Sequence, residues 1–105
     1  MKNFTEREKA FEAEFKRQEL MFRVTARRNR LFGLRAAAQL DVPAEEAEVY
    51  AKTVVAADFE APGDADIVKK VLTDFEEKGV AVTEAQLRAE LAVAAAEAHR
   101  QLAGC

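Results

Sequence analysis

The chain has 105 residues, a formal net charge of −3 and a 50% hydrophobic composition. This length suits one domain with a modest core. No apolar run approaches the roughly 18 residues that would span a bilayer, and the charged N-terminal region lacks the hydrophobic centre of a signal peptide. We therefore expect a cytoplasmic protein without direct membrane insertion. The single cysteine, Cys105, excludes an internal disulfide and a thiolate cluster for zinc.

The composition predicts an all-α fold, because helix-favouring residues dominate beside only four glycines and two prolines. The first helix is predicted to start at Thr5, since Thr5 and Glu8 match a capping box that satisfies free backbone N–H groups. It should run to about Gln39. Only Gly33 weakens its interior.

Three shorter helices are predicted after the first. Pro43 and the acidic residues that follow it mark the second helix, which should end before a turn at residues 61–64. The third should run from about Ala65 to Gly79, where glycine favours a helix end.

The fourth helix carries the clearest start signal in the chain. Thr83 and Gln86 repeat the capping-box pattern, and leucines and alanines then form an apolar face towards the C-terminus. The predicted fold is therefore a four-helix bundle with a long N-terminal helix.

A stripe of phenylalanines is the most unusual feature of the first helix. At about 100° per residue, its members fall within an arc of about 40°; they are Phe4, Phe11, Phe15 and Phe22. The later apolar residues of the same helix fall on the opposite side; they are Leu20, Val24, Leu31, Leu34 and Ala38. If the later residues face the core, a straight helix turns the phenylalanines outward, whereas a hinge near residues 20–22 would fold them back.

The free energy of ordering favours the outward arrangement. Ordering the backbone of this segment costs more than burying its phenylalanines gains. We therefore predict that residues 1–19 form a mobile or projecting arm, which folds as a helix in a partner's groove, and that residues 20–105 form the bundle. The competing interpretation is that the stripe packs within the bundle or in a homodimer.

Residues 23–35 form a basic segment in an otherwise acidic chain, with five arginines and no acidic residue. Nucleic-acid binding is one interpretation. We favour a solvated helix face that pairs with the acidic helices, because no helix-turn-helix signature or aromatic stacking platform accompanies the arginines. His99 has no partner at metal-ligand spacing, and no glycine-rich phosphate loop occurs. We therefore predict a protein without enzymatic activity, cofactor or metal.

The sequence resembles a known family. The likeness rests on the pattern F-x-x-R-E-x-A-F-E-A-x-F at residues 4–15, on Arg27-Arg28-Asn29 and Gly33-Leu34, and on GVAVTEAQLRAEL at residues 79–91. These segments resemble the zeta-subunit ATPase inhibitors of alphaproteobacterial F-type ATP synthases. One difference is Arg35, where members of that family usually carry tryptophan.

The resemblance implies a four-helix bundle whose N-terminal arm inserts between the catalytic subunits of the synthase head, touches the rotor and blocks ATP hydrolysis. The protein would then lie in the cytoplasm, peripheral to the inner membrane through the synthase. The four phenylalanines would anchor the arm. Charged residues beside them would fix its register; they are Arg7, Glu8, Glu12, Glu19 and Arg23. The alternative is a structural or assembly protein that associates with itself through the stripe.

Overall fold

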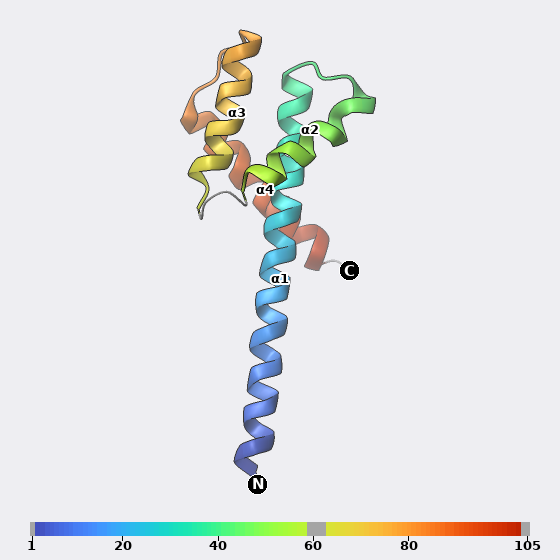
Figure 1. Cartoon of the computed structure of the whole chain (residues 1–105), viewed down its shortest axis with the longest axis vertical. Helices are drawn as coiled ribbons and strands as arrows, with labels where there is room; N and C mark the ends of the chain where they lie inside the picture. The colour runs from blue at the N-terminus through green and yellow to red at the C-terminus, as the bar shows by residue number, and fades with distance from the viewer. Residues whose placement is uncertain (1, 59–62, 104–105) are drawn as a thin grey trace.

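The computed structural model describes residues 2–58 and 63–103, with side chains from residue 7 onward. Over these ranges the chain forms four α-helices and no strand: α1 (Lys2–Gln39), α2 (Ala44–Ala57), α3 (Ala65–Lys78) and α4 (Glu84–Ala103). Figure 1 shows that α2, α3 and α4 gather around the C-terminal half of α1, while its N-terminal half projects alone. The predicted all-α fold with a long first helix is confirmed.

The start of α1 differs from the prediction, because the helix begins at Lys2 rather than at Thr5. Residues 2–4 contain no proline or glycine, so nothing in them interrupts a helix before Thr5. The predicted end at Gln39 is confirmed. The chain then reverses through Asp41, whose positive φ of 58° places it in the left-handed region.

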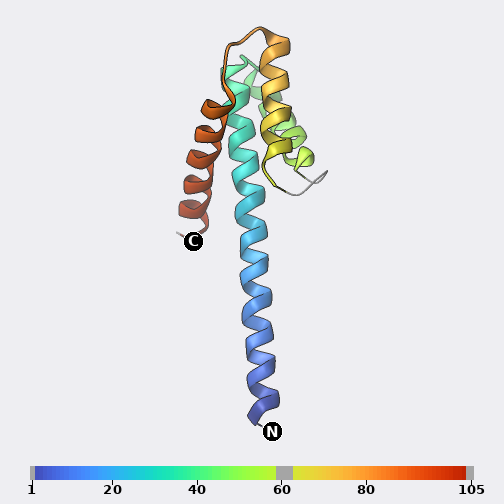
Figure 2. The ribbon, with the colours of Figure 1, turned by 90° about the vertical axis from the view of Figure 1, so that its left-hand side faces the viewer.

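α1 continues without a break through residues 20–22, so a hinge that folds the N-terminal half back is excluded. In Figure 2, the lower half of α1 runs straight away from the other helices. The longest dimension of the molecule is accordingly 64 Å, against 27 and 21 Å for the others.

The core lies where α1 passes between its neighbours. In Figure 2, α4 runs antiparallel beside the C-terminal half of α1, and α3 lies on the other side of α1. The largest fully buried apolar side chains come from all four helices; they are Phe32, Val54, Ile67, Val68, Val71, Phe75 and Leu87. We call this packed part, from Val24 onward, the body.

The packing of α1 corrects the predicted orientation of its core face. Ala38 and Leu20, which were expected to face the core, are exposed, whereas the buried Asn29, Ala36 and Leu40 lie within about 40° of the phenylalanine line. α1 packs on two faces, because α2 covers the phenylalanine side and α4 covers the opposite side. The phenylalanines are therefore exposed because α1 extends beyond the body, and not because they oppose a single core face.

The ends of α2, α3 and α4 follow the sequence signals closely. α2 begins directly after Pro43. α3 ends at Gly79, whose φ of 76° lets the amide of Val80 donate to the carbonyl of Phe75 at 2.9 Å. Part of the turn predicted at residues 61–64 lies outside the described residues, as does Cys105.

Both hydrogen bonds of the predicted capping box of α4 are present. The Thr83 amide donates to Gln86 Oε1 at 2.8 Å, and the Gln86 amide donates to Thr83 Oγ1 at 3.1 Å.

We expect Thr83→Ala to lower the free energy of unfolding by about 1 kcal/mol, because an N-terminal N–H group loses its acceptor. Urea unfolding monitored by circular dichroism measures this change. Thr83→Ser, which keeps the hydroxyl, should restore most of the loss, and failure to do so would contradict the capping role.

Tyr50 joins α2 to α3. Its hydroxyl donates to Asp74 Oδ2 at 2.7 Å, and Lys70 Nζ, which donates to the same oxygen at 2.7 Å, lies 5.3 Å from the centre of the Tyr50 ring. Burial raises the pKa of Tyr50 far above its usual value, and the hydrogen bond to the Asp74 carboxylate raises it further.

This raised pKa predicts a loss of stability at alkaline pH. In the unfolded chain the phenol ionises near about pH 10, whereas in the folded chain it stays protonated. The contribution of Tyr50 is therefore full below that pH and is lost as the pH rises further. Tyr50 is the one tyrosine and the chain lacks tryptophan, so near-ultraviolet absorbance reports its ionisation directly. Ionisation with an ordinary pKa in a chain that remains folded would contradict this assignment.

Candidate partner-binding site

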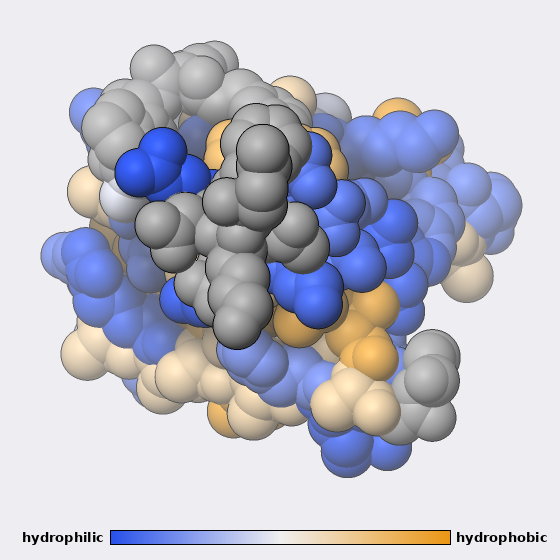
Figure 3. Space-filling model, turned by 90° about the horizontal axis from the view of Figure 1, so that it is seen from below, coloured by the Kyte–Doolittle hydropathy of each residue, from blue (hydrophilic) through white to orange (hydrophobic). Residues whose placement is uncertain are grey.

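The candidate site is the part of α1 that extends beyond the body. Every side chain of residues 7–23 is exposed, and Val24 is the first buried residue among the side chains of the helix that the structure describes. We call residues 7–23 the projecting segment. Figure 3 views the molecule from the end where this segment projects, and hydrophobic side chains appear there between hydrophilic ones. A helix in this position presents its whole circumference to solvent.

The phenylalanine stripe is exposed as far as its side chains are described. Phe11 is 74% exposed, Phe15 60% and Phe22 62%. The side chain of Phe4 lies outside the described residues. Large apolar groups in line on one exposed helix face are typical of a surface that binds another protein.

Charged side chains flank the stripe. Arg7, Glu8 and Glu12 are exposed. Glu19 and Arg23 form an ion pair, with Arg23 Nη2 3.0 Å from Glu19 Oε1. Such a pair contributes little stability at an exposed position, so its groups can be redirected to a partner at small cost.

The foot of the projecting segment holds a hollow that the sequence did not reveal. Its volume is about 320 Å³, and residues of α1 and the C-terminal end of α2 line it. We call it the foot hollow, and its lining residues are Met21, Phe22, Thr25, Ala26, Asn29, Val55 and Asp58. Phe22, a member of the stripe, is 62% exposed and lines the hollow, so the hollow opens next to the stripe. The sequence signal that could have revealed it is the position of Asn29, which falls on the line of the phenylalanines.

A buried polar network closes the inner end of this hollow. Asn29 is only 1% exposed. Its Nδ2 donates to Asp58 Oδ2 at 2.9 Å, and its Oδ1 accepts from Arg28 Nε at 2.9 Å. Arg28 Nη2 in turn lies 3.0 Å from Asp64 Oδ1. Both residues that flank the α2–α3 connection, Asp58 and Asp64, are thus held against α1.

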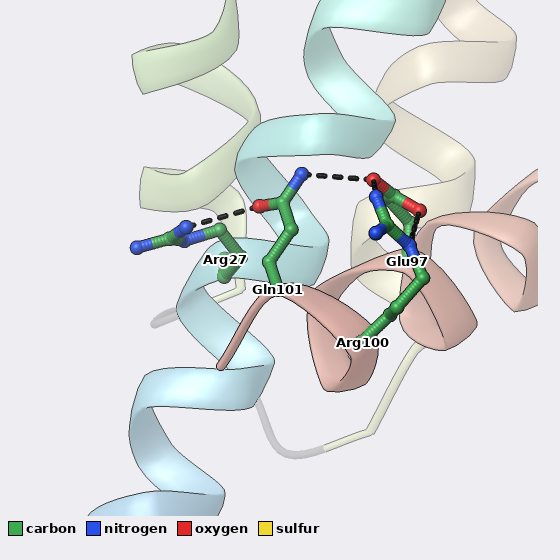
Figure 4. Close-up of polar contacts among 4 residues, drawn as sticks. All are labelled: Arg27, Glu97, Arg100 and Gln101. Carbon is green, nitrogen blue, oxygen red and sulfur yellow. Dashed lines mark hydrogen bonds and ion pairs between the residues drawn. The ribbon is translucent and has the colours of Figure 1, made fainter. Parts of the chain in front are cut away.

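A second polar network ties the end of α4 to α1 (Figure 4). Arg27 Nη1 donates to Gln101 Oε1 at 3.0 Å, and Gln101 Nε2 donates to Glu97 Oε1 at 3.0 Å. Glu97 also accepts from Arg100 Nε at 2.9 Å. Hydrogen bonds from Arg100 and Gln101 lower the pKa of Glu97 to about 2, so this carboxylate stays ionised at physiological pH. The end of α4 is thus fastened to α1 directly behind the projecting segment.

The basic segment at residues 23–35 is paired largely as we expected. Beyond Arg28 with Asp64, Arg30 Nε donates to Glu48 of α2 at 3.1 Å, and Arg35 Nε donates to Glu90 of α4 at 2.6 Å. The predicted pairing with acidic residues is therefore confirmed at these three arginines, whereas Arg28, whose side chain is only 15% exposed, does not belong to a solvated face. Arg35 thus joins α1 to α4 by an ion pair.

Among the residues that the structure describes, no group of three His, Cys, Asp or Glu side chains is placed to hold a metal ion. Within the same ranges, none of the helices combines the length and apolar character needed to cross a membrane.

A family model described as ATPase inhibitor subunit zeta matches residues 1–101, which is nearly the whole chain. No curated protein shows significant similarity to the chain. The match includes both the projecting segment and the body.

Proposed function

The chain belongs to the ATPase inhibitor subunit zeta family, and from this premise we propose that it inhibits ATP hydrolysis by inserting the projecting segment into the catalytic head of the F-type ATP synthase. The proposed partners are the catalytic subunits and the rotor. The protein would then be cytoplasmic and held at the inner membrane through the synthase. It would act by binding alone, without chemistry of its own.

One observation carries this proposal. The projecting segment is a helix in which all side chains are exposed, yet it bears Phe11, Phe15 and Phe22 at more than half exposure. Removing such side chains from water stabilises a complex by about 1.5 to 3 kcal/mol each. Over residues 7–23 no described part of the body buries this face, so a groove in another protein is the environment in which the stripe gains most.

The mechanism follows from the shape of the segment. A helix that fills the cleft at an open catalytic interface opposes the closure that the next hydrolytic step requires. The phenylalanines would enter the cleft as desolvated anchors. Arg7, Glu8, Glu12, Glu19 and Arg23 would select the register, because charge complementarity acts mainly on specificity and association rate.

The test is steady-state ATP hydrolysis by isolated synthase heads, titrated with the full-length chain. We expect hydrolysis to fall to a low plateau at saturating protein. An unchanged rate over the whole titration would refute the proposal. Sedimentation of the free chain examines the alternative: dimerisation that requires the phenylalanines, together with an unchanged hydrolysis rate, would favour self-association instead.

A further inference from the structure

The phenylalanine stripe does not stop at the last exposed turn of α1. Continued along the helix, its line passes over Ala26 and Asn29, both within about 40° of the phenylalanines. These two residues line the foot hollow together with Phe22. The hollow is therefore the direct continuation of the exposed stripe into the body.

The end of α2 stands beside this line and limits how far a partner can follow it. Val55 and Asp58 form the wall of the foot hollow opposite α1. Asp58 is fixed in place by its hydrogen bond from Asn29 at 2.9 Å. A groove that encloses the projecting segment can thus advance along α1 only until its rim meets α2.

Four of the seven residues that line the hollow are apolar, which favours an apolar group. The Asn29 amide is occupied on both sides, by Asp58 and by Arg28. The remaining α1 lining consists of the side chains of Met21, Phe22, Thr25 and Ala26. A volume of about 320 Å³ accommodates one large apolar side chain.

We propose that the foot hollow is a second contact with the same partner: it receives a large apolar side chain from the rim of the groove in the catalytic head, and so sets how deeply α1 inserts. This inference rests on the proposed function. The partner is the same because Phe22 belongs both to the stripe and to the hollow. A protein that encloses Phe15 and Phe22 has its rim at the mouth of the hollow.

The test measures the binding of full-length variants to isolated synthase heads. Val55→Lys places a charge in the hollow and should weaken binding by about tenfold, the size of effect seen at an interface anchor. The matched control is Val49→Lys, at a 62% exposed valine of the same helix outside the hollow, which should bind as the wild type does. If Val55→Lys disturbs the fold, Met21→Lys replaces it, because Met21 is 63% exposed and its replacement leaves the core intact.

The outcomes separate this inference from the proposed function. If the wild type fails to bind the heads, both are refuted. If Phe11→Ala with Phe15→Ala weakens binding while Val55→Lys and Met21→Lys bind normally, only the second contact is refuted. Loss of a concentration-dependent dimer in Val55→Lys, with unchanged binding to the heads, would assign the hollow to a second copy of the chain and would also refute it.

Discussion

Replacing both Phe11 and Phe15 by alanine should raise the concentration needed for half-maximal inhibition of ATP hydrolysis by about 100-fold or more. Each phenylalanine is more than half exposed in the free chain, so truncation removes little from the fold. The loss should therefore appear in binding, with the thermal midpoint of the body unchanged. Titration of synthase heads gives the inhibition, and circular dichroism gives the midpoint.

Two features make this result specific. Alanine favours the helix more than phenylalanine does, so a loss of inhibition cannot arise from a weakened helix. The matched control is Leu20→Ala, which truncates an apolar side chain that is 52% exposed but lies on the side of α1 opposite the stripe. If Leu20→Ala impairs inhibition as much as the double substitution does, the stripe is not the face that binds.

The positions of the helices were largely predictable because their signals are local. The reciprocal bonds between Thr83 and Gln86, and the left-handed Gly79 after α3, involve residues only a few positions apart. The spacing of the phenylalanines likewise needs only the helical repeat. Caps, helix ends and helical spacing can therefore be recognised within a short stretch of sequence.

The buried faces of α1 could not be predicted in the same way, because burial depends on which helices pack beside α1. A helical wheel assumes a single core face, whereas α1 lies between α2 and α4. The foot hollow depends on the contact of Val55 and Asp58 with residues about 30 positions earlier in the chain, a separation that no local rule relates. For the same reason the sequence did not show which acidic residue each arginine would meet.

At Gly33 helix propensity and tertiary packing predict opposite effects on stability. Replacing Gly33 by alanine shows which of the two effects is larger. By helix propensity alone, Gly33→Ala should stabilise α1 by about 1 kcal/mol. In the folded chain, however, an added Cβ would lie 2.8 Å from the Cα of Ala51 and 3.3 Å from the Cβ of Val54. The nearest atom belongs to the backbone of α2 and cannot turn away, so α2 must move. We expect a net loss of about 1 to 3 kcal/mol in unfolding free energy, as overpacked cores generally show.

The exposed Ala38 of the same helix provides the comparison for Gly33→Ala, because Ala38→Gly reports propensity with little change in packing. Both substitutions should destabilise the protein, although their effects on propensity have opposite signs. Thermal and urea unfolding of the two variants would establish this. A raised midpoint for Gly33→Ala would mean that α2 can withdraw freely, and then α2 could not hold Val55 and Asp58 firmly beside Phe22. The close approach of α1 and α2 at Gly33 is thus the packing feature on which the shape of the foot hollow depends.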